Sequence, residues 1–223
     1  MMNLRDLTGY LAELSANNNR AWFVMNKPRY DILREEFLGL VTDVIGQISK
    51  FDPLVFSCNP KKAIFRINRD VRFSKDKSPY KTIFSAAIVP SDLKKPSQGG
   101  GPMYYFQIDS HGELFFAVGE YMPPPDRLKQ IRQHIVEDGA SLVKILKNKK
   151  LLHALSSLQQ DSKLQRPPKG FGADHPQIEL IKLKNYVVSN QVMVSQLKVD
   201  TVAKTLIDKF KTAYPLVCWL RAA

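Results

Sequence analysis

Cysteine is scarce in this sequence: Cys58 and Cys218 are the only two among 223 residues. Two thiols without metal-ligand spacing exclude a disulfide framework and a zinc-binding motif, so we expect both to stay reduced. No segment approaches the roughly 18 consecutive apolar residues that a membrane-spanning helix needs. The N-terminal residues also lack the apolar core of a signal peptide. These absences predict a cytoplasmic protein that does not contact a membrane.

Sequence motifs for the common catalytic chemistries are missing as well. The chain contains no HExxH, GxSxG, CxxC, Walker or GxGxxG motif, and no acidic pair at the spacing of a metal site. We therefore predict no metal site, and the sequence indicates no cofactor. The motifs alone assign no reaction.

Positive charge, in contrast, is abundant and unevenly distributed. Lysine and arginine total 33 against 21 acidic residues, which gives a net charge of +12. The window 61–81 holds eight cations and two anions, so it supplies +6, half of the total. A second, looser basic region covers 144–153. Such a surplus attracts anionic partners, and its concentration in one window predicts a binding role there.

Hydrophobic periodicity predicts helices at both ends of the chain and strands between them. Leucines at positions 4, 7, 11 and 14 follow helical spacing, and a longer apolar stripe predicts a helix over 29–50. Alternating patterns and short apolar runs predict strands at 63–73, 83–89, 103–109 and 113–119. Helical patterns resume after Met122, with a break at 138–139 and a last helix that ends near Pro215.

This order of elements predicts an α+β fold in a single domain spanning 1–223. N-terminal helices lead into a central antiparallel sheet of about four strands, and further helices follow it. Ser110, His111 and Gly112 predict a tight turn between the last two of these strands, with a positive φ at Gly112.

Several segments of the chain resemble a bacterial and fungal family known as domain of unknown function 2461. The shared features are NNNRAWF at 17–23, PKKAIFRINRDVRFSKDKSPYKT at 60–82, YYFQI at 104–108, YMPPPDRL at 121–128 and PPKGFGADHP at 167–176. One departure is Tyr121, which stands where the family pattern has tryptophan. The resemblance covers nearly the whole chain and implies membership of the family, but it implies no activity, cofactor or catalytic residue.

The basic window is the strongest candidate for a binding site. On the predicted strand, alternation places Arg66, Asn68, Asp70 and Arg72 on one face, with neighbouring side chains about 7 Å apart. Arginine binds phosphate or carboxylate groups through two parallel hydrogen bonds, and Asp70 can hold one arginine in position. The full candidate set for ligand binding is Arg66, Asn68, Arg69, Asp70, Arg72, Lys75, Lys77, Tyr80 and Lys81.

The members of this set differ in their expected roles. The lysines lie on a turn that Pro79 stiffens, and Tyr80 is available to stack on a base or another ring. Arg69 interrupts the apolar side of the pattern, so we expect it to be paired and to act as a structural or anchoring residue.

Three interpretations of this array are open. The preferred one is a pocket for a phosphorylated small molecule or a nucleotide, in a protein that could be an enzyme acting on it. The second is a nucleic-acid-binding surface, which the net charge and the second basic region favour. In the third, the charges pair with one another and only hold the fold. The aromatic run Tyr104–Phe106 is also found in RNA-binding sheets, but its more common role is a packed core.

Asp70 and His175 are the two candidates for catalysis. His175 lies between Asp174 and Pro176 in a stiff loop, where an imidazole can act as a general acid or base. The alternative, which we favour, is that Asp174 or His175 caps the helical segment that follows. We predict no role for the remaining histidines, His111, His134 and His153.

Overall fold

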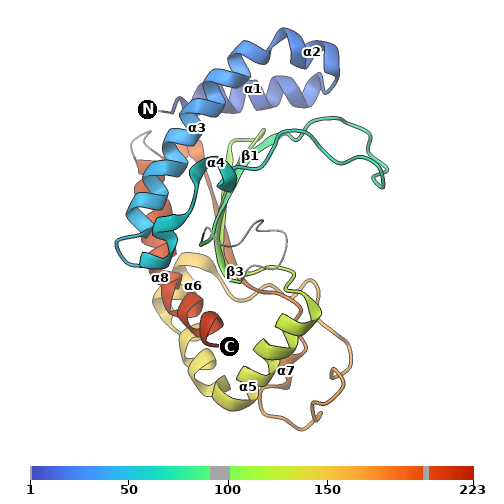
Figure 1. Cartoon of the computed structure of the whole chain (residues 1–223), viewed down its shortest axis with the longest axis vertical. Coiled ribbons are helices and arrows are strands. Elements are labelled where there is room, and N and C mark those ends of the chain that lie inside the picture. Colours follow the sequence, from blue (N-terminus) through green and yellow to red (C-terminus); the bar gives the residue numbers. More distant parts are fainter. Residues whose placement is uncertain (1, 91–100, 198–200) are drawn as a thin grey trace. The chain divides into compact units, whose positions relative to one another are not determined.

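The computed structural model describes residues 2–90, 101–197 and 201–223 of the chain. These residues form an α+β fold with a four-stranded antiparallel sheet in the order β1-β2-β3-β4 (Figure 1). The strands are β1 Ile83–Ile88, β2 Met103–Asp109, β3 Glu113–Glu120 and β4 Tyr186–Met193.

Helices precede and follow the first three strands along the chain, which confirms the predicted fold class. The α-helices are α1 Leu4–Ala16, α2 Arg20–Met25, α3 Lys27–Ile48, α4 Pro60–Ala63, α5 Pro125–Leu146, α6 Lys149–Leu155, α7 Ile178–Ile181 and α8 Val202–Ala222. Two short 3-10 helices are η1 Pro53–Ser57 and η3 Val194–Gln196. None of the helices in the described ranges is long and apolar enough to cross a lipid bilayer.

The chain divides into two compact units. Unit 1 comprises Met1–Ile88, Tyr105–Phe116 and Gln191–Ile207, and unit 2 comprises Val89–Tyr104, Ala117–Asn190 and Asp208–Ala223. β2, β3 and β4 each contribute residues to both units. The single domain expected from the sequence therefore stays a prediction.

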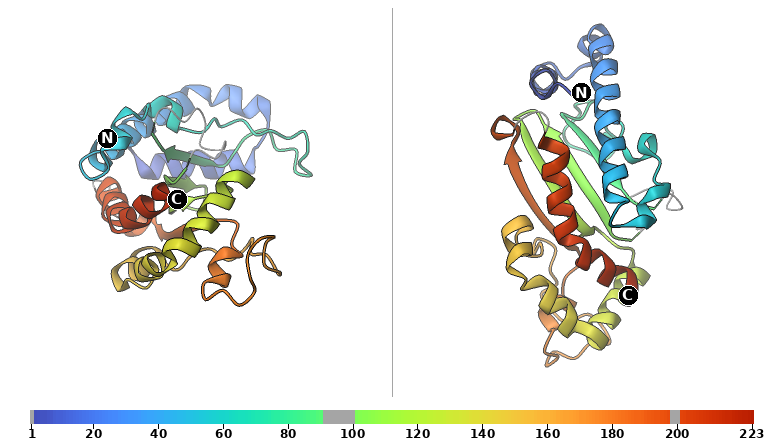
Figure 2. Two further views of the ribbon diagram at one scale, coloured as in Figure 1. Left: turned by 60° about the horizontal axis from the view of Figure 1, so that its bottom comes forward. Right: turned by 90° about the vertical axis from the view of Figure 1, so that its left-hand side faces the viewer.

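The core of unit 1 joins its N-terminal helices to the strands. The leucines of α1 at positions 7, 11 and 14 are completely buried, as their spacing predicts. Figure 2 shows α3 running alongside the strands. The ring of Phe37 on α3 lies 5.4 Å from that of Phe84 in β1 and 5.6 Å from that of Phe106 in β2. Aromatic pairs at these separations add stabilisation beyond the burial of their surface. The helices of unit 1 thus cover the face of the strands on which Phe84 and Phe106 lie.

The core of unit 2 contains one backbone position that only glycine fits. Gly119 in β3 has a φ of +133°, and a Cβ built on it would lie 1.9 Å from the carbonyl oxygen of Tyr186 in β4. Tyr186 is itself fully buried, and its hydroxyl donates a hydrogen bond to the carbonyl of Leu180 at 2.9 Å. β3 and β4 therefore approach each other here more closely than any side chain would allow.

The tight turn predicted between the second and third strands of the sheet is confirmed. Gly112 has a φ of +76°, and its N–H donates to the carbonyl of Asp109 at 3.1 Å. The Asp109 carboxylate also accepts hydrogen bonds from the backbone N–H groups of His111 and Glu113. The hairpin is thus closed by its glycine and by the side chain of the residue that ends β2.

The predicted strand at 63–73 is wrong. α4 ends at Ala63, and the residues that follow form only isolated antiparallel bridges, between Ile64 and Ala86 and between Asn68 and Tyr80. The fourth strand of the sheet is instead β4, which the sequence pattern did not indicate. The break expected at 138–139 is confirmed, because Asp138 has a non-helical backbone (φ −136°, ψ 35°) that divides α5 into two helical segments across a kink. One helix prediction needs correction: α8 continues beyond Pro215.

Candidate functional site

The basic window forms a projecting arm, which we define as residues 64–82. This basic arm carries six cations and two anions, and Lys61 and Lys62 of α4 adjoin it. Backbone hydrogen bonds close it like a hairpin: the N–H of Arg69 donates to Pro79 at 2.9 Å, and that of Lys81 donates to Ile67 at 2.8 Å. The arm extends away from the helices and strands of unit 1 (the teal segment at the right of Figure 1).

The base of the basic arm is anchored by Asn18, which lies between α1 and α2, and by Phe23 of α2. The side chain of Asn18 donates to the carbonyl of Tyr80 at 2.9 Å and accepts from its N–H at 3.0 Å. The Tyr80 ring stacks on Phe23, with ring centroids 4.0 Å apart and an interplanar angle of 18°. Tyr80 is buried, so it is not the exposed stacking residue that the sequence analysis expects; it holds the arm in place.

The tip of the basic arm is shaped by its own charged residues. The carboxylate of Asp76 pairs with Arg69 and accepts hydrogen bonds from the N–H and the hydroxyl of Ser78, at 2.9 and 2.6 Å. The hydrogen bonds from Ser78, followed by the one from Arg69, lower the pKa of Asp76 well below its usual range. Lys77 donates to the carbonyl of Val71 at 3.0 Å. Arg69, Asp76 and Lys77 thus have structural roles, as the sequence predicts for Arg69.

Asp70 and Arg72 form a local ion pair on the solvent-exposed side of the arm. The guanidinium donates to both carboxylate oxygens, from Nε at 2.9 Å and from a terminal nitrogen at 2.7 Å. These hydrogen bonds lower the pKa of Asp70 to about 2. A carboxylate with such a pKa is a poor proton acceptor near neutral pH, so its setting favours charge pairing over general base catalysis.

Other cations of the arm have no carboxylate within ion-pair distance in the described part of the chain. They are Arg66 and Lys75, both exposed, and Lys81, which is half-buried. Burial and, next, the charge of Arg66 lower the pKa of Lys81, and Arg66 also contributes to the low pKa of Asp70. Arg66 is therefore close enough to both residues to act on them electrostatically. Asn68 is exposed beside it.

An aromatic surface adjoins the base of the arm in unit 1. We call the residues Phe65, Tyr105 and Phe115 the aromatic face. The Tyr105 ring lies 6.2 Å from that of Phe65 and 6.2 Å from that of Phe115, and the ammonium of Lys81 lies 5.2 Å from the centre of the Phe65 ring. All three rings are half-buried, whereas their neighbours along β2 and β3, such as Phe106, are fully buried.

The packed core favoured above for Tyr104–Phe106 holds for Tyr104 and Phe106 but not for Tyr105, and a signal for this difference was present in the sequence. In a strand, residues two apart point to the same side. The buried Phe106 therefore predicts that Tyr105 points away from the core, and the buried Phe116 predicts the same for Phe115. Phe65 joins them because the arm pairs with β1 at its base, where the N–H of Phe65 donates to the carbonyl of Ser85 at 3.0 Å.

His175 lies in unit 2, and its arrangement matches the capping interpretation. Its Nδ1 accepts a hydrogen bond from the backbone N–H of Gln177 at 3.0 Å, and its carbonyl accepts from the N–H of Ile178 at 2.9 Å. Both donors belong to the start of α7, where backbone N–H groups have no helical partner. A ring nitrogen that is used in this way supports the start of a helix.

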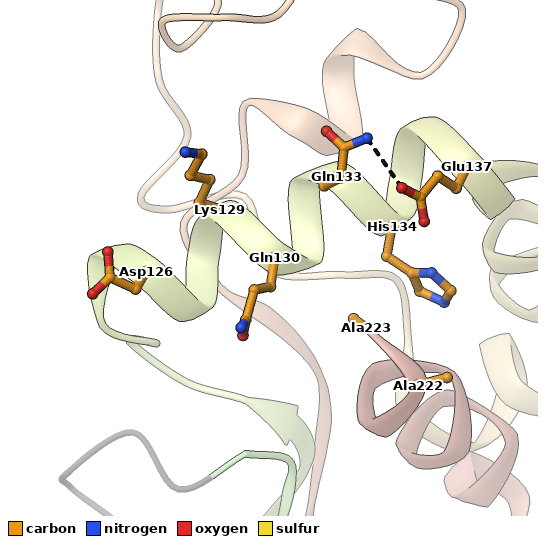
Figure 3. Close-up of a pocket in the computed structure, with 8 residues that line it drawn as sticks. All are labelled: Asp126, Lys129, Gln130, Gln133, His134, Glu137, Ala222 and Ala223. Carbon is orange, nitrogen blue, oxygen red and sulfur yellow. Dashed lines mark hydrogen bonds between the residues drawn. The ribbon is translucent and has the colours of Figure 1, made fainter.

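Unit 2 also contains an open polar groove of about 480 Å³ (Figure 3). Gln130 and His134 extend from α5 toward the end of α8, whereas Lys129 and Gln133 extend from another side of α5. The His134 ring packs on Trp219, with ring centroids 4.5 Å apart, and Gln133 donates to Glu137 at 3.1 Å. The groove is thus lined by both acidic and basic residues, and several of its side chains already contact one another or Trp219. Its lining therefore favours no particular class of ligand.

A smaller cavity of about 320 Å³ in unit 1 is lined by Asn3, Arg5, Asp6 and Arg29. The guanidinium of Arg29 pairs there with Asp6 at 2.6 Å and with Glu13 at 2.9 Å. These two carboxylates satisfy the arginine, which ties α3 to α1. Residues of the basic arm line neither this cavity nor the groove.

The fold and the surface together define an α+β protein with an anchored basic arm beside an aromatic sheet face. The sequence profile of the family described as conserved hypothetical protein (DUF2461) matches residues 6–219. The chain therefore belongs to this family, as the motifs in the sequence indicate. Comparisons with curated proteins and with solved structures found no match.

Proposed function

We propose that the basic arm binds the phosphate groups of an extended anionic partner. The observation that carries this proposal is the exposure of Arg66, Arg72 and Lys75 along an arm that projects from unit 1. Exposed cations at intervals along an extended segment suit a polymer with regularly spaced phosphates. Neutralising such phosphates releases condensed counterions, which is the main source of affinity in this kind of binding.

A small phosphorylated ligand fits the arm less well than a polymer does. Small-molecule sites are concave and bury about 70–90% of their ligand. The side chain of Arg72 is 76% exposed, and Phe73 beside it is 94% exposed. The cavities described above are lined by other residues. Among the interpretations of the sequence, the polyanion-binding one is therefore the better supported.

A purely structural role accounts for only part of the charge. Arg69, Asp76 and Lys77 bond to groups within the arm and shape its tip. Arg66 and Lys75 contribute no such bond in the described structure, and like-charged groups left unpaired on one arm repel each other. Their presence is explained by an anionic partner and not by the folding of the arm.

The first test removes three exposed cations from the arm. We expect the triple variant Arg66→Gln/Arg72→Gln/Lys75→Gln to bind a single-stranded thymidine oligomer of about 12 nucleotides at least tenfold more weakly than wild type. The plot of log affinity against log salt between about 50 and 200 mM should also become shallower, by roughly 2, because about 0.7 counterions are released per phosphate contact on a single strand. Fluorescence anisotropy measures both quantities.

The matched control is Lys147→Gln/Lys149→Gln/Lys150→Gln, which removes the same charge from the second basic region. All three of these lysines are exposed, so the substitutions should not disturb the core. An equal loss of affinity in both triple variants would reject the arm as the binding site. Failure of wild type to bind the oligomer, or tight binding of ATP that the arm substitutions abolish, would reject the polyanion proposal.

A second test changes affinity in the opposite direction. Asp70 is ionised at neutral pH, because Arg72 lowers its pKa to about 2, and it therefore offsets the charge of that arginine. We expect Asp70→Asn to strengthen binding of the same oligomer several-fold, since Arg72 is then available to phosphate. Weaker binding by Asp70→Asn would instead mean that the carboxylate is needed to hold Arg72 in its binding geometry.

A further inference from the structure

We infer that the aromatic face stacks nucleobases, so that the partner of the basic arm is a single-stranded nucleic acid. This inference rests on the proposed function and adds to it the chemical class of the partner. It depends on three observations. They are the row of rings formed by Phe65, Tyr105 and Phe115, the charge beside that row, and the incomplete burial of these rings in the described part of the chain.

The first observation is the arrangement of the rings. Two neighbouring strands and the base of the arm present three aromatic side chains in a row, with successive centroids 6.2 Å apart. The interplanar angles of 70° and 64° leave the rings tilted edge to face, so they are not stacked on each other. Each ring also keeps part of its surface exposed, and this part is available to other planar groups. Aromatic side chains on a sheet stack two or three bases in known modes of RNA binding.

The second observation is the position of positive charge. The ammonium of Lys81 lies over the Phe65 ring at 5.2 Å, and burial and, next, the nearby charge of Arg66 lower the pKa of Lys81. The basic arm begins at this ring and continues outward. A strand of nucleic acid with bases on the rings would therefore place its phosphates along a continuous line of cations. Stacking platforms beside a positively charged path are the usual design of single-strand binding surfaces.

The third observation distinguishes this face from an ordinary core. Phe106 and Phe116, on the opposite face of the same strands, are fully buried, and the helices of unit 1 pack against Phe106. On the aromatic face the rings are only half-buried. Gln107, also half-buried, accepts a hydrogen bond from the Tyr105 hydroxyl at 2.6 Å. The amide of the same residue also carries N–H donors, which can bond to the edge of a base.

Stacking requires bases that are not paired in a duplex. In double-stranded nucleic acid the base faces are covered by their neighbours, and only groove edges and phosphates are accessible. The half-buried rings would therefore contribute nothing to duplex binding. We expect a preference for single strands over duplex of the same length, in addition to the charge-dependent binding that both forms share.

The test compares an oligomer that has bases with one that lacks them. The probes are a single-stranded thymidine oligomer of about 12 nucleotides and an abasic oligomer of equal length and charge. Wild type should bind the oligomer with bases about 10- to 100-fold more tightly, because each stacked base contributes a measurable gain. The double variant Tyr105→Leu/Phe115→Leu keeps only the Phe65 ring, so it should lose most of this preference and bind the oligomer with bases at most a few-fold more tightly than the abasic one.

Leucine keeps an apolar side chain at both positions, so the fold should be retained, and thermal unfolding checks this. Tyr105→Phe is the matched control, because it keeps the ring and loses only the hydroxyl; we expect at most a twofold change in affinity. Equal binding of the two probes by wild type would reject the stacking face while leaving the basic arm intact. Absence of binding to either probe would reject the arm and the face together.

Discussion

Gly119→Ala is expected to be the most destabilising single-methyl change in unit 2. The new Cβ would lie 1.9 Å from the carbonyl oxygen of Tyr186 and 2.9 Å from its carbonyl carbon, both backbone atoms of the neighbouring strand. The φ of +133° adds a conformational cost of about 1–3 kcal/mol for any residue with a side chain. Since the clash can only be relieved by separating β3 from β4, we expect a total loss of at least about 4 kcal/mol.

This loss would appear as a fall in melting temperature of about 8–16 °C, measured by circular dichroism. The matched control is Gly46→Ala in α3. No atom lies within 4 Å of its Cβ position and its backbone is helical, so alanine should stabilise the protein by about 0.5–1 kcal/mol. If Gly119→Ala melts within a few degrees of wild type, the close approach of β3 and β4 at this position is not real.

Arg127→Met should be nearly as damaging, because it leaves a buried carboxylate without its partner. Glu120 at the end of β3 is 1% exposed, and Arg127 of α5 contacts its two oxygens at 3.0 and 3.1 Å. The same guanidinium donates to the carbonyls of Leu220 and Ala223 at the end of α8. Removing one partner of a buried pair costs about 3–5 kcal/mol. Urea unfolding at neutral pH measures this loss.

The cost of Arg127→Met should depend on pH. Burial raises the pKa of Glu120 in the folded protein, and the arginine opposes that rise. Without the arginine the folded pKa rises further, so the folded state binds a proton more readily than the unfolded state does. Stability is then greatest below the unfolded pKa and falls as the pH rises through the folded pKa. The loss should therefore be largest at neutral pH and shrink toward about pH 4.5.

Two further variants separate the effect of the buried charge from other effects. In Glu120→Gln/Arg127→Met no charge is left in the site, so part of the stability should return and the pH dependence should disappear. Arg72→Met removes a similar pair of contacts from an exposed position, and we expect little change in melting temperature. A loss in Arg127→Met that is equally large at every pH would show that the carbonyl contacts, and not the charge of Glu120, account for its importance.

The sequence predicted most elements of the fold, because their apolar residues recur at the spacing of a helix or of a strand. α1, α3 and the first three strands lie within a few residues of the expected ranges. The prediction of a strand at 63–73 failed because alternation describes the side chains of an extended segment and not its hydrogen bonding. The even-numbered residues from Arg66 to Arg72 are exposed as expected, yet the segment pairs only at its base and then leaves the sheet.

β4 and α8 are elements that form although the local sequence pattern does not predict them in full. β4 begins with a continuous apolar run, Tyr186 to Val188, which is buried. It continues with three polar residues, Ser189 to Gln191, and ends with Val192 and Met193, none of which is fully buried. Apolar and polar residues do not alternate in either half, so the two-residue period typical of a half-buried strand is absent from β4. In α8 the helix passes Pro215 because Leu216, Val217 and Leu220 beyond it are fully buried. Tertiary packing thus outweighs the local cost of the proline.

The candidate site was predicted in part. The sequence located the basic arm, because a high density of positive charge can be read directly from the order of residues. It also predicted that Arg69 is paired, because this arginine interrupts the alternation of apolar and polar residues. It did not predict that Tyr80 is buried, because the residues that bury and bond it, Phe23 and Asn18, lie more than fifty positions away. The aromatic face also depends on neighbours from separate segments, and only pairing of the strands brings these together.

The anchoring of the arm by Asn18 and Phe23 has a consequence for the kinetics of binding. The hairpin hydrogen bonds and ion pairs of the arm are made within the chain itself, so the polyanion proposed above would meet a preorganised surface. Little loop entropy is then lost on association, which leaves more of the interaction energy to set the affinity. Encounters should be fast and steered by charge, and the lifetime of the complex should depend on the contacts made afterwards.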